Sequence, residues 1–337
     1  MKTKNYNMEL VRTISFVMVI LIHVTNYYCR AYTDISRGEY LFSLILDTIS
    51  RVSVPCFFML SGALLLGRTE RLKKNGERLL RFLIVLAFWS IVYYFFNVYY
   101  MDTPYDLSTI LFEPTEPHLW YLYATIPIYM VLPFFQIMCR GMSANMDKAF
   151  LLMGSLAALF LYVSSMMHEE AYYDVPIIGD RIYTFYFFIG YFICKYREKI
   201  KRSSWQILVI FLASNTLNVI LTAWMSYRKG DHYERFLEYG CPLVIISGVA
   251  FFVLIMQIAD GHVSLKETTR KWIDRWCSCS FGIYLIHILF LDNYKKYVEA
   301  EAVSAWIAVP VLTIAILGVS FACIYLIRKL PFGKYIT

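Results

Sequence analysis

The chain has 337 residues, of which 59% are hydrophobic, 18% aromatic and 17% charged, and its mean hydropathy is +0.52. Soluble domains carry about 45–50% apolar and about 25% charged residues, so this composition argues against a soluble enzyme. The net charge of +7 does not indicate nucleic-acid binding, because the cations cluster between long apolar blocks. We therefore expect an all-α, polytopic membrane protein without a nucleic-acid partner.

The apolar blocks predict about ten transmembrane helices. No small-residue cleavage site follows the first block, so we interpret it as a retained helix rather than a signal peptide. The sixth and ninth blocks are shorter than the roughly 20 residues that cross a bilayer, which favours helices that are tilted, broken or packed inside the bundle. The predicted spans are 8–28, 41–67, 79–100, 119–138, 149–167, 181–195, 205–226, 238–259, 279–294 and 304–328.

The charges of the connecting loops predict the orientation. Basic segments follow the second, sixth, eighth and tenth spans, whereas two loops on the opposite side are acidic, and loop 227–237 is mixed. By the positive-inside rule, both termini are expected in the cytoplasm. The whole chain, 1–337, is expected to form one integral membrane domain without a fused soluble domain. The basic segments are 67–81, 195–204, 265–275 and 328–334, and the acidic loops are 101–118 and 168–180.

The first span, RTISFVMVILIH, carries a cation and an imidazole in an otherwise apolar run. Arg12 and His23 are eleven residues apart, which is about three helical turns plus roughly 20°, so they share one face about 16 Å apart. An arginine near the inner surface suits a phosphate, and a deeper histidine can act as a general base or carry an acyl group. An acyl-CoA thioester has that long shape. The alternative is a snorkelling arginine with a hydrogen-bonded core histidine.

Asp47 and Arg51 lie four residues apart in the second span, so we expect them to form an ion pair. This pair either hydrogen-bonds hydroxyls of an acceptor or only positions the helix. The Ser61–Gly62 pair in the same span lacks the context of a nucleophile elbow, and we expect it to permit close helix packing.

Arg78 and Arg81 lie at the start of the third span at i, i+3, so one helix face presents both guanidinium groups. With the neighbouring lysines, they either bind the nucleotide phosphates of CoA or contact anionic lipid.

Two further groups of polar residues adjoin or interrupt apolar runs. His118 and Trp120, at the start of the fourth span, either bind a polar acceptor or anchor the helix at the interface. Ser280, Tyr284 and His287 form a polar stripe on the ninth span, which indicates that this stripe faces the interior of the bundle. No metal site is expected, because the chain lacks an HExxH motif and a second cysteine pair to match Cys277 and Cys279.

Five elements together resemble the acyltransferase-3 family of integral membrane acyltransferases, over nearly the whole chain. They follow the order of that family and agree with the predicted topology. They are Arg12-x10-His23, VPCFFMLSGALLL (54–66), the Arg78-x-x-Arg81 pair, HLWYL from His118, and SFGIYLIH (280–287).

The resemblance implies transfer of an acyl group, most often acetyl, from cytoplasmic acyl-CoA to a hydroxyl of a cell-surface glycan or glycolipid. It implies His23 as the catalytic residue and Arg12, Arg78 and Arg81 as the residues that hold the donor. The expected location is the bacterial cytoplasmic membrane, in contact with lipid. Any extracytoplasmic transferase module would be a separate partner, and the oligomeric state is not predicted. Residues predicted to bind the acceptor are Asp47, Arg51, His118, Trp120, Ser280, Tyr284 and His287.

An alternative function shares the same motifs. Some relatives of this family are the membrane parts of amino-acid racemases that are thought to transport serine. A transporter of serine or another small polar solute would also place polar residues along a path through the membrane.

Overall fold

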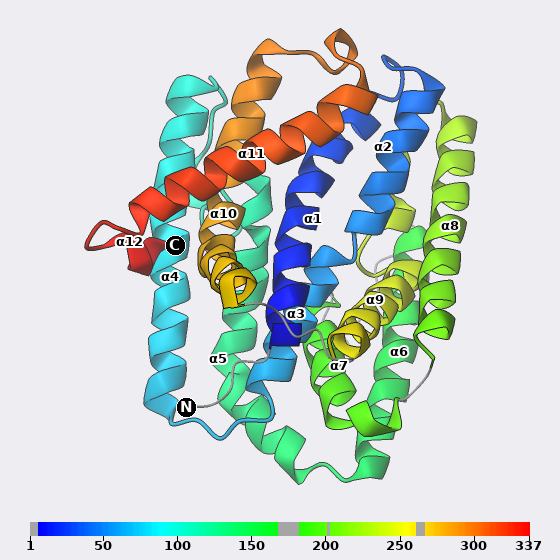
Figure 1. The fold of residues 1–337 in the computed structure, drawn as a ribbon, viewed down its shortest axis with the longest axis vertical. Helices are drawn as coiled ribbons and strands as arrows, with labels where there is room; N and C mark the ends of the chain where they lie inside the picture. Colours follow the sequence, from blue (N-terminus) through cyan, green and yellow to red (C-terminus); the bar gives the residue numbers. More distant parts are fainter. Residues whose placement is uncertain (1–5, 168–181, 201–202, 261–266) are drawn as a thin grey trace.

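The computed structural model describes residues 6–167, 182–200, 203–260 and 267–337 (Figure 1). Helices dominate these ranges, and no β-strand occurs among the residues described. The helices are α1 (Tyr6–Arg30), α2 (Arg37–Ser50), α3 (Ser53–Leu65), α4 (Leu72–Phe95), α5 (Trp120–Gly141), α6 (Ala144–Met166), α7 (Tyr183–Lys195), α8 (Ser204–Lys229), α9 (Pro242–Asp260), α10 (Glu267–Tyr297), α11 (Ala305–Ile327) and α12 (Gly333–Ile336). Short π or 3₁₀ turns are η1 (Phe96–Tyr100), η2 (Leu107–Thr109), η3 (Pro117–Leu119), η4 (Arg197–Lys199), η5 (Arg235–Leu237) and η6 (Ala300–Ala302).

Eight helical segments in the described part of the chain are long and apolar enough to cross a membrane, which confirms an all-α polytopic membrane protein. The predicted sixth span corresponds to α7, which has only 13 residues and is buried along most of its length. The predicted acidic loop 168–180 lies outside the described residues. The eight segments are Met8–Arg30, Arg37–Leu65, Leu72–Tyr100, Pro117–Gly141, Ala144–Met166, Ser204–Lys229, Arg235–Gln257 and Ala305–Ile327.

The ninth predicted span differs most from the structure. We predicted a loop at 265–275 and a short span from 279, but α10 already begins at Glu267 and continues for 31 residues. An ion pair between Glu267 and Lys271 at i, i+4, with a 2.8 Å contact, is compatible with helix in this charged stretch. The charged residues between 267 and 275 therefore belong to the helix α10, and their charge did not indicate a loop.

The second predicted span consists of two helices separated at Arg51 and Val52. Pro55 lies in the first turn of α3, where its missing N–H costs no intrahelical hydrogen bond. The predicted ion pair forms across this break, with Arg51 Nη2 2.8 Å from Asp47 Oδ2. The break therefore places Arg51 at a corner of the bundle interior rather than on a regular helix face.

Close contact between α3 and α7 depends on two glycines. A Cβ atom on Gly62 would lie 1.7 Å from the carbonyl oxygen of Phe187, and one on Gly190 would lie 1.9 Å from that of Met59. The backbones can approach this closely only because both positions lack a side chain. The predicted packing role of Gly62 is confirmed.

Contacts between connecting segments divide the molecule into two ends. The end of α1 meets the segments before α9 and α11, whereas Arg81 of α4 meets the segment after α11, and the loop before α4 meets the end of α5. This grouping agrees with the alternation expected for the ten predicted spans. We call the end that contains the C-terminus of α1 the outer end, and the end that contains the loop before α4 the inner end. That the inner end faces the cytoplasm remains a prediction from loop charge. Examples are Tyr27 with Val298 and Arg30 with Glu234 at the outer end, and Arg140 with Thr69 and Arg81 with Thr337 at the inner end.

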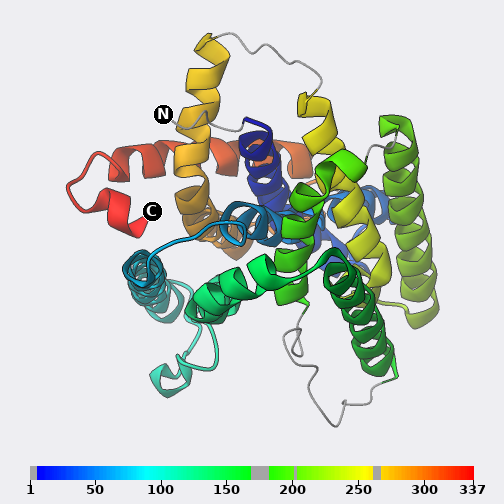
Figure 2. The same cartoon turned by 90° about the horizontal axis from the view of Figure 1, so that it is seen from below.

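Helix α1 lies near the middle of the bundle (Figure 2). It packs against α2, α3, α9, α10 and α11, and α11 crosses obliquely in front of α10 and α1 in Figure 1. Because α1 runs between the two ends and is surrounded by other helices, one of its faces can line a cavity over most of its length.

Candidate functional site

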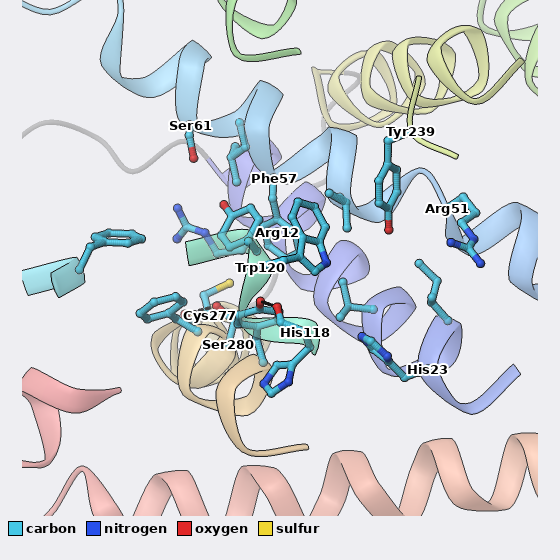
Figure 3. A pocket seen from close by; sticks show the side chains of 18 of the residues that line it. Arg12, His23, Arg51, Phe57, Ser61, His118, Trp120, Tyr239, Cys277 and Ser280 are labelled. Carbon is cyan, nitrogen blue, oxygen red and sulfur yellow. Dashed lines mark hydrogen bonds between the residues drawn. The ribbon is translucent and has the colours of Figure 1, made fainter. Parts of the chain in front are cut away.

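One cavity of about 580 Å³ connects residues of the inner and outer ends. Helix α1 contributes six lining side chains; apart from the adjacent pair Ile22 and His23, they recur at intervals of three, four or seven residues, as one helix face requires. Arg12 and His23 both belong to this set, in agreement with their predicted common face (Figure 3). The cavity-lining residues of α1 are Arg12, Val19, Ile22, His23, Asn26 and Arg30.

Three arginines line the inner end. Arg12 is paired with Glu9 at 2.9 Å, and Arg81 and Arg328 converge on one backbone oxygen. The Nη2 atom of Arg81 and the Nη1 atom of Arg328 lie 3.0 and 3.3 Å from the backbone oxygen of Thr337, the last residue of the sequence. Two guanidinium groups around one acceptor form a geometry that suits a phosphate oxygen. The inner end is therefore suited to bind an anion.

Arg78 does not line this cavity. It forms an ion pair with Glu70 at 2.8 Å, and its guanidinium lies 6.0 Å from the centre of the Tyr129 ring, which does line the cavity. Burial acts to raise the pKa of Glu70, but hydrogen bonds from Arg78 and Lys74 outweigh it and lower this pKa below its usual value. The structure therefore brings Arg81 into the cavity and holds Arg78 beside it.

Three histidines meet in the middle of the cavity region. The His23 ring centre lies 5.1 Å from that of His287 and 6.4 Å from that of His118, and the last two are 5.5 Å apart. They come from α1, η3 and α10, so segments far apart in sequence meet here. His23 and His118 line the cavity, whereas His287 is fully buried next to His23.

Hydrogen bonds to backbone carbonyls indicate the tautomers of two of these histidines. Nδ1 of His287 lies 2.6 Å from the Tyr284 carbonyl oxygen, and Nε2 of His118 lies 3.3 Å from that of Leu285. A carbonyl oxygen only accepts hydrogen bonds, so each of these nitrogens carries the proton in the neutral ring. The opposite nitrogens, Nε2 of His287 and Nδ1 of His118, are buried without a hydrogen-bond partner. Each offers a lone pair inside the site.

The other predicted residues of α10 also lie at the cavity. Ser280 and Tyr284 line it, and the Tyr284 hydroxyl donates a hydrogen bond to the backbone carbonyl of His118. This bond ties α10 to η3 and helps to fix the position of His118. Ser61 lines the cavity from α3, together with Phe57.

The outer end combines charged and aromatic side chains. Arg51 lines the cavity, and its partner Asp47 is fully buried and also accepts a 3.2 Å hydrogen bond from the Thr25 hydroxyl. Trp120 and Tyr239 line the same region, with ring centres 5.8 Å apart. In Figure 3 His23, Arg51 and Tyr239 lie on one side of the cavity, whereas Ser61 and Cys277 lie towards the other.

Sequence reasoning missed several residues of the cavity. Asn26 and Arg30 follow His23 at i+3 and i+7, so the same rotation that linked Arg12 to His23 could have identified them. Glu234 lies in the loop of mixed charge to which we assigned no role, and Arg328 lies in a basic segment that we used only for topology. No local pattern connects either of these two residues to α1.

Several known proteins are similar to this chain. A protein of Staphylococcus aureus (strain MRSA252) named "probable poly-beta-1,6-N-acetyl-D-glucosamine export protein" is 21% identical over 347 residues, covering 99% of this chain and 96% of that protein. An amino-acid racemase of Enterococcus faecalis is 27% identical over 340 residues, covering 88% of this chain but 43% of the racemase. No solved structure matches the chain.

The sequence model of the acyltransferase-3 family, described as an acyltransferase domain, matches residues 5–327. This match includes α1 through α11 and every lining residue of the cavity except Arg328 and Thr337. The chain is an integral membrane protein that belongs to the acyltransferase-3 family.

Proposed function

We propose that the protein transfers an acyl group, most often acetyl, from cytoplasmic acyl-CoA to a hydroxyl of a cell-surface polysaccharide. One observation carries the proposal: a single cavity has an anion-binding inner end, histidines in its middle and a polar, aromatic outer end. A donor with a phosphate-bearing head and a thioester tip, together with a hydroxylated acceptor, matches that order. Family membership supports the reaction class.

In this proposal the arginines of the inner end bind the phosphates of the donor. Arg12 and Arg81 line the cavity, Arg328 joins them, and Arg78 supports the site from outside the lining. The rise of an α-helix separates Arg12 from His23 by about 16 Å, which leaves room for the extended arm of a CoA thioester. The acyl carbon would then lie close to His23.

His23 is the proposed catalytic residue. As a general base, it takes the proton of the acceptor hydroxyl while that oxygen attacks the thioester carbonyl; the carbon–sulfur bond then breaks, and the departing thiolate receives a proton. As an acyl carrier, its nitrogen first attacks the thioester, releases CoA and then passes the acyl group to the hydroxyl. In either route the buried Nε2 lone pair of His287 can stabilise positive charge on the His23 ring, 5.1 Å away between ring centres.

The two routes differ in a measurable intermediate. The purified protein is incubated with labelled acetyl-CoA without acceptor, quenched and digested. An acetyl label on the His23 peptide supports the carrier route. If no peptide is labelled and CoA is released only when the acceptor is also present, the result supports the base route. Turnover that persists unchanged in His23→Ala would remove this residue from the mechanism altogether.

The polysaccharide acceptor is proposed from two observations. The outer end presents hydrogen-bonding and aromatic side chains, and the printed name of the staphylococcal relative refers to poly-beta-1,6-N-acetyl-D-glucosamine. Deletion of the gene in its native host, followed by mass spectrometry of the surface glycans, tests the assignment. Loss of a fixed acyl mass from one polymer would identify both acyl group and acceptor; unchanged glycans would contradict the proposal.

Transport is the second candidate, because one relative is named an export protein. A transporter would use the cavity as a solute path and would not need a thioester donor. Binding of acetyl-CoA that depends on Arg81 favours the enzyme. Uptake of labelled serine into proteoliposomes, without acetyl-CoA binding, favours the transporter.

A further inference from the structure

Two ion pairs at the outer end each combine one positive and one negative side chain. Arg30 and Glu234 form one ion pair at 2.8 Å, and Arg51 and Asp47 form another at 2.8 Å. Two positive and two negative charges sum to zero. Burial lowers the pKa of the neighbouring His232, so this ring remains neutral near pH 7 and does not change the balance.

Glu234 is the centre of this arrangement. Its carboxylate accepts hydrogen bonds from Arg30 Nε at 2.8 Å and from Asn26 Nδ2 at 3.3 Å. Burial acts to raise the pKa of Glu234, but hydrogen bonding and the charge of Arg30 outweigh it, so the pKa lies below its usual value. The carboxylate is therefore ionised at neutral pH and held in place at the edge of the cavity.

The paired groups keep hydrogen-bonding capacity for a ligand. The ion pair with Asp47 engages Nε and Nη2 of Arg51, and a guanidinium carries five N–H donors. The amide of Asn26 donates to Glu234 through nitrogen, and its oxygen is an acceptor. Such alternating donors and acceptors match hydroxyl and N-acetyl groups, which both donate and accept.

An aromatic wall completes this part of the cavity. Trp120 and Tyr239 both line it, with ring centres 5.8 Å apart and planes inclined by 34°. The C–H faces of a sugar ring are apolar and pack on aromatic side chains, while the hydroxyls at the ring edge need polar partners. The outer end offers both kinds of surface.

We propose that the outer end binds a neutral sugar unit of the acceptor and discriminates against units that carry a carboxylate or a free amine. This inference rests on the proposed function and names its acceptor class. An anionic unit would meet Glu234, and a cationic unit would meet Arg30 and Arg51; the carboxylate of Asp47 lies behind Arg51 and does not line the cavity. To gain a full ion pair of its own, either one must compete with the charged partner already in place, which weakens that pair in a partly buried site. A neutral unit leaves both pairs intact.

Three matched oligosaccharides test the selectivity: an oligomer of N-acetylglucosamine, the same oligomer without its N-acetyl groups, which is cationic, and an oligomer of N-acetylated aminouronic acid, which is anionic. Binding to the full-length protein in nanodiscs is measured by isothermal titration calorimetry. We expect the neutral oligomer to bind at least about tenfold more tightly than either charged one, since like-charge contact costs more than 1.4 kcal/mol. Equal or tighter binding of a charged oligomer would overturn the inference.

Two variants make opposite changes in charge at the same ion pair. Glu234→Gln makes the outer end positive and should shift relative affinity towards the anionic oligomer, whereas Arg30→Gln makes it negative and should shift it towards the cationic one. Shifts in the same direction, or none, in folded variants would contradict the inference. Thermal unfolding and retained acetyl-CoA binding at the inner end establish that each variant is folded. If either variant is not folded, the relative affinity of the wild-type protein for the three oligomers decides whether the inference stands.

The outcome separates this inference from the proposed function. Selective binding of the neutral oligomer without acetyl transfer would overturn the proposed reaction and leave the sugar site in place. Acetyl transfer to charged and neutral oligomers alike would overturn the site and leave the reaction in place.

Discussion

The two ends of the cavity use arginine in different ways. At the inner end Arg81 and Arg328 converge on a backbone oxygen, and neither pairs with an aspartate or glutamate among the described residues. At the outer end Arg30 and Arg51 are each paired with a carboxylate. Arg12, the third arginine of the inner end, is paired with Glu9. A guanidinium without a carboxylate side chain as its partner attracts an anionic ligand, whereas a paired one contributes shape and hydrogen bonds without net charge. The same residue type thus predicts different ligands at the two ends.

The largest expected effect concerns the residue between the two ends. His23→Ala should lower the rate of acyl transfer by about 10²–10⁴-fold, the usual contribution of a general base. Binding at both ends should persist, because neither set of arginines depends on this ring. Stopped-flow or radiometric turnover with acetyl-CoA measures the rate, and calorimetry measures binding. Parallel loss of acetyl-CoA binding would mean that the two ends are not separate binding regions.

The two outer ion pairs should differ in their importance for stability. Asp47 is fully buried and the Arg51 side chain is 14% exposed, whereas the Arg30 and Glu234 side chains are 67% and 40% exposed. Arg51→Met leaves a buried carboxylate unpaired and should cost about 3–5 kcal/mol of unfolding free energy. Arg30→Met, the matched control, should cost less than about 1 kcal/mol. Unfolding in mixed micelles gives both values; similar losses would show that exposure does not distinguish the pairs.

A third carboxylate close to the outer end should bind a proton near neutral pH. Burial, together with the charge of Asp292, raises the pKa of Glu116 to about 7, although a 2.9 Å hydrogen bond from Asn97 opposes the shift. The folded-state pKa exceeds the unfolded value of 4.5, so stability is fully present below about pH 4.5 and falls as pH rises through 7. The total change is about 3 kcal/mol.

Glu116→Gln is the direct test of this pH dependence. Glutamine has a similar shape but does not titrate, so the variant should lose the decline in stability between pH 4.5 and 7 that this residue causes. Unfolding free energies measured at several pH values for both proteins supply the difference. An unchanged pH profile would mean that Glu116 has the same pKa in the folded and the unfolded protein.

At the inner end, two arginines three residues apart should differ in donor binding. Arg81→Gln should raise the KM for acyl-CoA by about 10–100-fold, because it removes a charge-assisted hydrogen bond worth about 1.5–3 kcal/mol. Arg78→Gln should have a smaller effect, since Glu70 already holds that guanidinium. Kinetics at several salt concentrations measure both, and the contribution of Arg81 should decrease as salt increases. An equal effect of the two variants would favour the shared phosphate site predicted from their spacing.

Much of the fold follows from local sequence patterns. Apolar blocks predicted the helical membrane architecture, and the 3.6-residue period placed Arg12 and His23 on one face of α1. The i, i+4 spacing predicted the pair of Asp47 and Arg51. These features depend on residues within one or two helical turns, or on a single straight helix, so a sequence shows them directly.

The remaining features depend on contacts between distant segments. Glu234 reaches Arg30 across 204 positions of the chain, and no periodicity encodes that contact. The spacing of Arg78 and Arg81 gave them a common face, but Glu70 in the preceding loop draws only Arg78 away from the cavity. The start of α10 was misplaced because a charged, amphipathic helix outside the membrane has the same composition as a basic loop.

The continuous face of α1 has a consequence for energy supply. From Arg12 to Arg30 the helix rises about 27 Å, close to the thickness of the hydrocarbon core of a bilayer. In the proposed reaction, the nucleotide remains on one side and the sugar on the other, and only a small uncharged acyl group crosses between them. A thioester made in the cytoplasm would thus drive modification of a polymer outside the cell, in a compartment without nucleotide triphosphates. Inserting one residue between His23 and Asn26 would rotate the remainder of this face by about 100° and interrupt that route.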